Sequence, residues 1–184
     1  LACDRKRPIV PYLIGEQVIQ HGRARLIGVN LERKIDFVTV LLHELGHGLG
    51  FLTLVNLNTG QKLNGFNDAY MRLLEDHSTG KSSPQMTDAE RLAASTNIGN
   101  LHWTGPNVVA GSGGLTAGRH PSGHVRMYAP NPAQSGSSVS HYDTALSPNE
   151  LMEPSYTGPL HDVGLTVELF ADLGWNVSGI SLLP

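Results

Sequence analysis

The longest hydrophobic run of the chain extends from Phe37 to Gly50, and apolar side chains point in nearly every direction around it. Asp36 precedes the run and can accept backbone N–H bonds, which makes it the expected N-cap of a helix. Gly48 and Gly50 can end that helix, because glycine tolerates the left-handed conformation found after helix C-termini. Helices that are apolar nearly all round are normally buried. We therefore predict a buried helix that starts after Asp36 and ends at these glycines.

The remaining chain predicts short elements separated by loops. Runs that favour strands occupy residues 8–14, 25–29, 101–109 and 124–129. Helical signals occupy residues 66–76, 87–94 and 166–173. The second of these opens with a capping box from Thr87 to Glu90, and the third has Thr166 as its expected cap and Gly174 as its end. Segments rich in Gly, Asn, Pro or Ser predict loops at 56–67, 111–123 and 130–140.

Length and composition indicate one globular domain. The chain has 184 residues, of which 40% are apolar and 16% charged, and this length is sufficient to bury a core. The net charge of −3, without a basic stripe, argues against nucleic acid as the main partner. Because no uncharged apolar run reaches about 18 residues, we expect no transmembrane segment. We expect a single domain over residues 1–184, with an N-terminal part of about 1–51 and a C-terminal part of about 52–184.

The predicted helix carries His43-Glu44-Leu45-Gly46-His47, the pattern H-E-x-x-H. Positions i and i+4 project from one helix face, about 6 Å apart, so the two imidazoles can bind one zinc ion. Glu44 lies beside them and is placed to take a proton from water and pass it to a leaving amine. Two histidines and a glutamate are costly to bury without partners, which favours a zinc site over a chance occurrence of the motif.

A catalytic zinc ion takes three protein ligands and keeps one position open, so a third ligand must come from another segment. Spacing favours His141, which follows a loop and has the carboxylate of Asp143 nearby for support. His161 is a rival, and Glu75 on the helix predicted over 66–76 would make a glutamate-liganded site.

His120 and His124 form another i, i+4 pair in the sequence. Pro121 and Gly123 lie between and favour a loop over a helix. We therefore interpret these two histidines as surface or supporting residues.

The run from His43 to Phe51 matches H-E-x-x-H-x-x-G, the start of the zinc-binding signature of metzincin peptidases. In most metzincins the third histidine follows three residues after the glycine, where this chain has Thr53. The leishmanolysin-like branch has a long insertion at that point, and this chain resembles that branch over residues 35–51 and 138–175. The segment 140–143 is similar to the one that carries the distant ligand there, so the resemblance implies His141 as the third ligand.

The segment Asn149-Glu150-Leu151-Met152-Glu153-Pro154 follows at the distance expected of a Met-turn. The resemblance implies that Met152 packs beneath the ligands without binding the metal. Some metzincins have a tyrosine two residues after this methionine; here that place is Pro154, and Tyr156 is two residues further on. Tyr156 is therefore a candidate for transition-state support, with packing in the pocket wall as the alternative.

The resemblance implies an α+β fold of the metzincin type, with an N-terminal twisted sheet, an active-site helix and a loop-rich C-terminal part that contains the Met-turn. The 42 residues before His43 leave room for two or three strands, where metzincins have four or five. The implied function is a zinc-dependent endopeptidase with one catalytic Zn²⁺ and Glu44 as general base. Its substrates would be proteins or peptides, aligned by an edge strand before the helix.

Two other classes of function remain open. One is a zinc hydrolase that acts on a non-peptide bond, or a peptidase with Glu75 as third ligand. The other is a non-catalytic binding module whose zinc is structural and closed by a fourth protein ligand. Glu44, which a structural site does not require, favours catalysis.

Smaller features add little to this picture. The asparagines at 56, 58, 64 and 67 offer oxygen ligands, but with Asp68 as the only carboxylate we do not expect calcium. Cys3 is the only cysteine, so no intrachain disulfide can form, and a latent zinc ligand, a lipid-attachment site or an unused thiol remain open for it. The type of enzyme implies a secreted or cell-surface protein of bacterial origin, and we expect a monomer.

Overall fold

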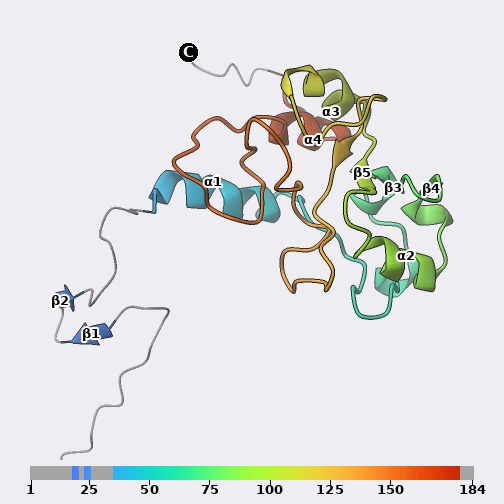
Figure 1. Cartoon of the computed structure of the whole chain (residues 1–184), viewed down its shortest axis with the longest axis horizontal. Coiled ribbons are helices and arrows are strands. Elements are labelled where there is room, and N and C mark those ends of the chain that lie inside the picture. Colours follow the sequence, from blue (N-terminus) through green and yellow to red (C-terminus); the bar gives the residue numbers. More distant parts are fainter. Residues whose placement is uncertain (1–17, 21–22, 26–34, 179–184) are drawn as a thin grey trace, which may run out of the picture. The chain divides into compact units, whose positions relative to one another are not determined.

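A computed structural model describes residues 18–20, 23–25 and 35–178 of the chain. The chain divides into two units, Leu1–Lys34 and Ile35–Pro184, which are described separately. In the first unit, β1 (Val18–Gln20) pairs antiparallel with β2 (Arg23–Arg25) (Figure 1). The strand predicted over 8–14 and nearly all of that predicted over 25–29 lie outside the described residues.

The helix predicted after Asp36 is present as α1, Phe37–Gly48. The Asp36 side chain caps it by accepting a hydrogen bond from the Thr39 backbone N–H at 2.8 Å, which confirms the predicted N-cap. Gly50, with φ of +112°, takes the left-handed conformation just past the helix end.

Within its own unit, α1 is buried on one face only. The prediction of a buried helix is therefore wrong there. Thr39 and Gly46 are buried, whereas Phe37, Leu41 and Leu45 are 73%, 43% and 50% exposed. Thr39 and Gly46 are seven residues apart, which is two helical turns, so they lie on one face. Segments of Ile35–Pro184 cover that face and leave the opposite apolar face open.

A small antiparallel sheet lies in the second unit, with strand order β4-β3-β5-β6. Its strands are β3 (Leu74–Asp76), β4 (Lys81–Ser82), β5 (Leu101–Trp103) and β6 (Val125–Arg126). Leu74 pairs with Trp103, which pairs in turn with Val125, so these three apolar residues share one face. All three are buried, and this face of the sheet therefore belongs to the core.

The described part of the second unit has three further α-helices: α2 (Asp88–Ala94), α3 (Pro106–Gly111) and α4 (Thr166–Asp172). Short 3-10 helices occupy Leu63–Gly65, Met71–Leu73, Ser83–Gln85 and Ser112–Gly114. Helix α2 begins with the predicted capping box, and both of its hydrogen bonds, between Thr87 and Glu90, are formed. Helices α3 and α4 pack side by side (Figure 1). The described residues include no helix long and apolar enough to cross a membrane.

Four predicted elements differ from the structure. The strand predicted over 124–129 is limited to β6, Val125–Arg126. Residues 66–70 are irregular, Met71–Leu73 form a 3-10 turn and Leu74–Asp76 form β3. The pairing of β3 with β5 overrides the helical spacing. The strand predicted over 101–109 stops at Trp103, and Pro106 starts α3 at a position where proline needs no N–H partner. Thr166 is the first residue of α4, not its cap, and its hydroxyl is buried without a partner.

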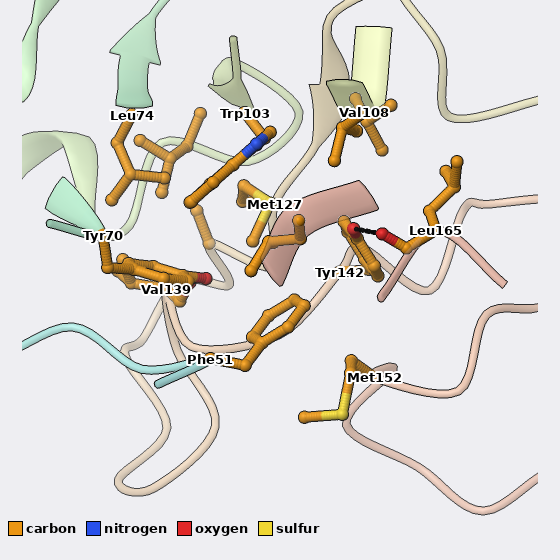
Figure 2. Packing of buried hydrophobic residues seen from close by; sticks show 14 of the residues in the cluster. Phe51, Tyr70, Leu74, Trp103, Val108, Met127, Val139, Tyr142, Met152 and Leu165 are labelled. Carbon is orange, nitrogen blue, oxygen red and sulfur yellow. Dashed lines mark hydrogen bonds between the residues drawn. The ribbon is translucent and has the colours of Figure 1, made fainter. Parts of the chain in front are cut away.

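The core is a continuous cluster of aliphatic, aromatic and methionine side chains that extends from the sheet to the end of α1 (Figure 2). Phe51, just after α1, packs edge-on against Tyr142 with ring centroids 5.0 Å apart. Tyr70 packs against Trp103 at 4.8 Å. Both tyrosine hydroxyls are satisfied, because Tyr70 donates to the Val139 carbonyl and Tyr142 to the Leu165 carbonyl. The core thus fixes the segment that follows α1 and the residues on either side of His141.

Candidate metal centre

The structure brings His43, His47 and His141 together. His43 and His47 are one turn apart on α1, and His141 arrives from the long segment after β6. The three Nε2 atoms form an equilateral triangle, with 3.2 Å between each pair. Three nitrogens bound at ~2.0–2.1 Å to a tetrahedral zinc ion would lie ~3.3 Å apart. The separations observed are those that such an ion requires.

Each imidazole is oriented by a backbone carbonyl on its other nitrogen. The Nδ1–H groups of His43, His47 and His141 donate to the carbonyls of residues 151, 51 and 137, at 2.9, 2.9 and 2.8 Å. Carbonyl oxygens only accept, so the proton of each neutral ring is on Nδ1 and every Nε2 presents a lone pair. Three lone pairs therefore converge on one point. This arrangement suits a bound cation, and it allows no hydrogen bond between the neutral rings.

Burial lowers the pKa of His141 to about 4, and the neighbouring His47 and His43 act in the same direction. The His141 ring is therefore neutral near pH 7, as a metal ligand must be.

His141 is held in place by the loop that precedes it and by its neighbours. Ser140 Oγ accepts a hydrogen bond from the backbone N–H of Thr53, the position of the third histidine in the contiguous signature. Val139 adopts a positive φ of 69°, which is unusual for a β-branched residue, and its carbonyl is bonded by Tyr70. The Tyr142 N–H donates to the Met152 carbonyl at 2.9 Å. These bonds join the His141 segment to the end of α1 and to the predicted Met-turn.

The support expected from Asp143 is not found. Its carboxylate accepts from the backbone N–H of Ala145 at 2.8 Å, while the Ser137 carbonyl takes the His141 Nδ1–H. The carboxylate therefore closes a turn in its own segment, because aspartate commonly accepts a hydrogen bond from the N–H two residues further along the chain.

Met152 is fully buried and packs directly on α1. A Cβ placed on Gly46 would lie 2.5 Å from the Met152 sulfur, so only glycine leaves room for this contact. Gly46 immediately precedes His47, and the Leu151 carbonyl beside Met152 accepts the His43 Nδ1–H. Met152 therefore lies against the helix that carries two of the histidines and helps to set the distance between α1 and residues 151–152.

The other residues considered as third ligands lie elsewhere. His161 Nε2 is 2.8 Å from an Asp36 carboxylate oxygen at the start of α1. Glu75 belongs to β3 and lies with His77 and His124, in a separate group of potential ligands. In the part of the chain that the structure describes, the group around His43 and His47 has His141 as its only third member.

A hollow of about 140 Å³ adjoins His43, one member of the histidine triangle. His43 and Glu44 line it from α1, and Glu150, Glu153 and Tyr156 line it from residues 150–160. Glu44 is exposed and thus accessible to solvent in this hollow. The Tyr156 hydroxyl accepts a hydrogen bond from the Asp36 N–H at 3.1 Å, at the N-terminal end of α1.

Two carboxyl groups in the hollow are perturbed by their surroundings. Burial raises the pKa of Glu150 to about 7, and it also raises the pKa of Glu153. Glu150 accepts from the Leu165 N–H at 2.9 Å, and Glu153 accepts from the Glu150 N–H at 2.9 Å. Neither hydrogen bond outweighs the loss of water around the charged form.

Sequence reasoning missed the carbonyls that orient the rings and the close approach of Gly46 to Met152. The carbonyls leave no signal in side-chain identity. Gly46 did carry a signal, because a glycine in the middle of a helix costs stability and is usually retained for close packing. Cys3 lies outside the described residues.

Comparison of the chain with protein-family models, curated proteins and solved structures finds no match to any of the three. The metzincin resemblance therefore depends on the motifs of this chain alone.

We predict that Gly46→Ala lowers the free energy of unfolding by about 1–3 kcal/mol, because the new methyl group collides with buried Met152. Gly48→Ala is the matched control in the same helix, since no atom lies within 4 Å of its added Cβ. It should be neutral or stabilising by up to about 1 kcal/mol. Chemical denaturation of the zinc-free chain measures both, and in a Met152→Ala background the cost of Gly46→Ala should shrink. An equal cost in both backgrounds would contradict the contact.

We also predict that Glu150 makes the protein less stable as pH rises. Its pKa is about 7 in the folded chain, above the ordinary 4.5, so the folded state binds the proton more tightly than the unfolded state. The contribution of Glu150 to the free energy of unfolding is then fully present below pH 4.5. It falls by about 3 kcal/mol as pH rises through 7. Glu150→Gln keeps an oxygen for the Leu165 N–H and should remove this decline. Parallel profiles of unfolding free energy against pH for the two proteins would contradict it.

Proposed function

We propose that this protein is a zinc-dependent endopeptidase that hydrolyses peptide bonds of protein or peptide substrates. The observation that carries the proposal is the convergence of three Nε2 lone pairs, from His43, His47 and His141, at equal separations of 3.2 Å. The fold and function implied by the metzincin resemblance remain part of the proposal.

The three histidines would hold the zinc ion through Nε2, with their Nδ1 protons kept on backbone carbonyls. Bound zinc supplies a Lewis acid that polarises a carbonyl and lowers the pKa of water toward 7. Glu44, next to His43 and open to the hollow, would take the proton from the attacking water and give it to the leaving amine. Tyr156, in the wall of the same hollow, is the candidate donor to the developing oxyanion.

A catalytic site is favoured over a structural one by two features. Structural zinc sites are closed by four protein ligands, and the described part of the chain supplies three to this group. His43 and Glu44 line one hollow, and a purely structural site has no use for an exposed glutamate there. The choice of a peptide bond over another bond depends on the similarity to the metzincin signature.

We predict that His141→Ala lowers the zinc content by one ion per chain relative to the parent protein. His161→Ala is the matched control, because His161 bonds Asp36 and belongs to neither group of potential ligands found among the described residues. Zinc analysis of the purified proteins after dialysis measures the difference. If His161→Ala loses the ion and His141→Ala keeps it, the assigned ligand set is wrong.

We predict that Glu44→Gln keeps the zinc ion of this site but loses casein hydrolysis by 10²-fold or more, about the contribution of a proton shuttle. Casein cleavage by the parent should be abolished by a zinc chelator and restored by zinc. Full cleavage by zinc-loaded Glu44→Gln would refute the role of Glu44. A zinc-loaded parent that leaves casein and gelatin intact would refute the peptidase assignment.

A further inference from the structure

A second group of histidines lies on the face of the sheet that points away from the core. Glu75 pairs with His102, and His102 pairs with Arg126, so these residues share one face. His77 directly follows β3 and His124 directly precedes β6, two residues from Glu75 and Arg126 respectively. The centroids of the two histidine rings are 5.0 Å apart. The register therefore gathers polar and basic side chains opposite the buried face of Leu74, Trp103 and Val125.

Three atoms of this group are close enough to bind one metal ion. His77 Nε2 is 2.9 Å from His124 Nδ1 and 3.3 Å from Glu75 Oε1, and the last two atoms are 3.9 Å apart. Ligands at ~2.0–2.1 Å from a tetrahedral ion would be ~3.3 Å apart, which lies within this range. Two imidazole nitrogens and one carboxylate oxygen are a ligand set that zinc accepts.

The His77 ring is held in position by its neighbours. It stacks on His102 with ring centroids 3.7 Å apart and an angle of 14° between planes. The Asn100 carbonyl accepts both the His77 backbone N–H at 2.8 Å and the His102 Nδ1–H at 2.9 Å. His77 is therefore fixed at the backbone and at the ring, as a metal ligand needs to be.

His124 is fixed by a tight loop before β6. Its carbonyl accepts a hydrogen bond from the His120 N–H at 2.9 Å, and the Gly123 N–H bonds the His120 carbonyl at 2.8 Å. The sequence prediction that residues 120–124 form a loop is correct. The interpretation of His124 as a surface or supporting histidine did not foresee its place beside Glu75 and His77.

Hydrogen bonds alone account poorly for the group. A neutral His77 ring carries one N–H proton. If that proton is on Nε2, it can form a full hydrogen bond to His124 or to Glu75, but not to both. A cation between the three atoms satisfies all of them at once.

We infer that Glu75, His77 and His124 form a second divalent transition-metal site, of zinc-binding type, on the outer face of the sheet. It shares no residue with the group of His43, His47 and His141. The site would link the end of β3 to the loop that precedes β6. His120, whose ring centroid is 4.5 Å from that of His77, borders the site.

The test is a zinc count on the full chain. Each protein is equilibrated with zinc chloride, freed of loose metal on a chelating resin, and analysed for zinc per chain. The parent should hold two ions, Glu75→Gln and His124→Ala one each, and His141→Ala one. The double variant His124→Ala/His141→Ala should hold none. Glu90→Gln and His161→Ala are matched controls outside both groups and should keep two.

Glu75→Gln preserves side-chain shape, and its circular dichroism should match that of the parent, so a lower zinc count there cannot be a folding defect. Cobalt in the His141→Ala background gives a second readout, because tetrahedral Co²⁺ bound by Glu75, His77 and His124 should absorb strongly in the visible range. That absorption should vanish on adding His124→Ala.

The two sites can fail independently. One zinc ion that is lost in Glu75→Gln and His124→Ala but kept in His141→Ala would support the second site and contradict the proposed catalytic one. An equal zinc count in the parent, Glu75→Gln and His124→Ala would overturn the second site and leave the proposed peptidase untouched.

Discussion

The geometry of the candidate metal centre depends on three hydrogen bonds from imidazole Nδ1–H groups to backbone carbonyls. They commit the only proton of each neutral ring and leave three Nε2 lone pairs 3.2 Å apart. The carbonyls belong to Phe51, Leu151 and Ser137, residues far apart in the chain. Any shift of these three segments would turn a ring and break the triangle, so the site is only as rigid as the packing behind the carbonyls.

That packing comes from the core. Phe51 and Met152 are fully buried (Figure 2). The Phe51 carbonyl orients the His47 ring, and Met152 follows Leu151, whose carbonyl orients the His43 ring. Tyr142, next to His141, packs on Phe51 and bonds the Leu165 carbonyl. Gly46 lets Met152 approach α1 more closely than any larger residue would allow. The same apolar cluster thus stabilises the fold and sets the distances among the candidate ligands.

The small sheet has one apolar face and one polar face. One face buries Leu74, Trp103 and Val125 in the core, and the other gathers Glu75 with a group of histidines. Strand alternation makes this division, because neighbouring residues on a strand point to opposite faces. A strand as short as β3 can therefore contribute to the core and to a candidate metal site at once.

The sequence by itself determined α1, its Asp36 cap and the capping box of α2, because these depend on residues within a few positions of each other. It also placed His43, Glu44 and His47 on one turn, since the helical repeat alone brings them together. Only the tertiary structure decided that His141 joins them while His161 and Glu75 do not, because contacts across about 100 residues depend on how loops fold. It likewise decided the strand over Leu74–Asp76 and the exposed face of α1, where pairing and packing partners outweigh local preference.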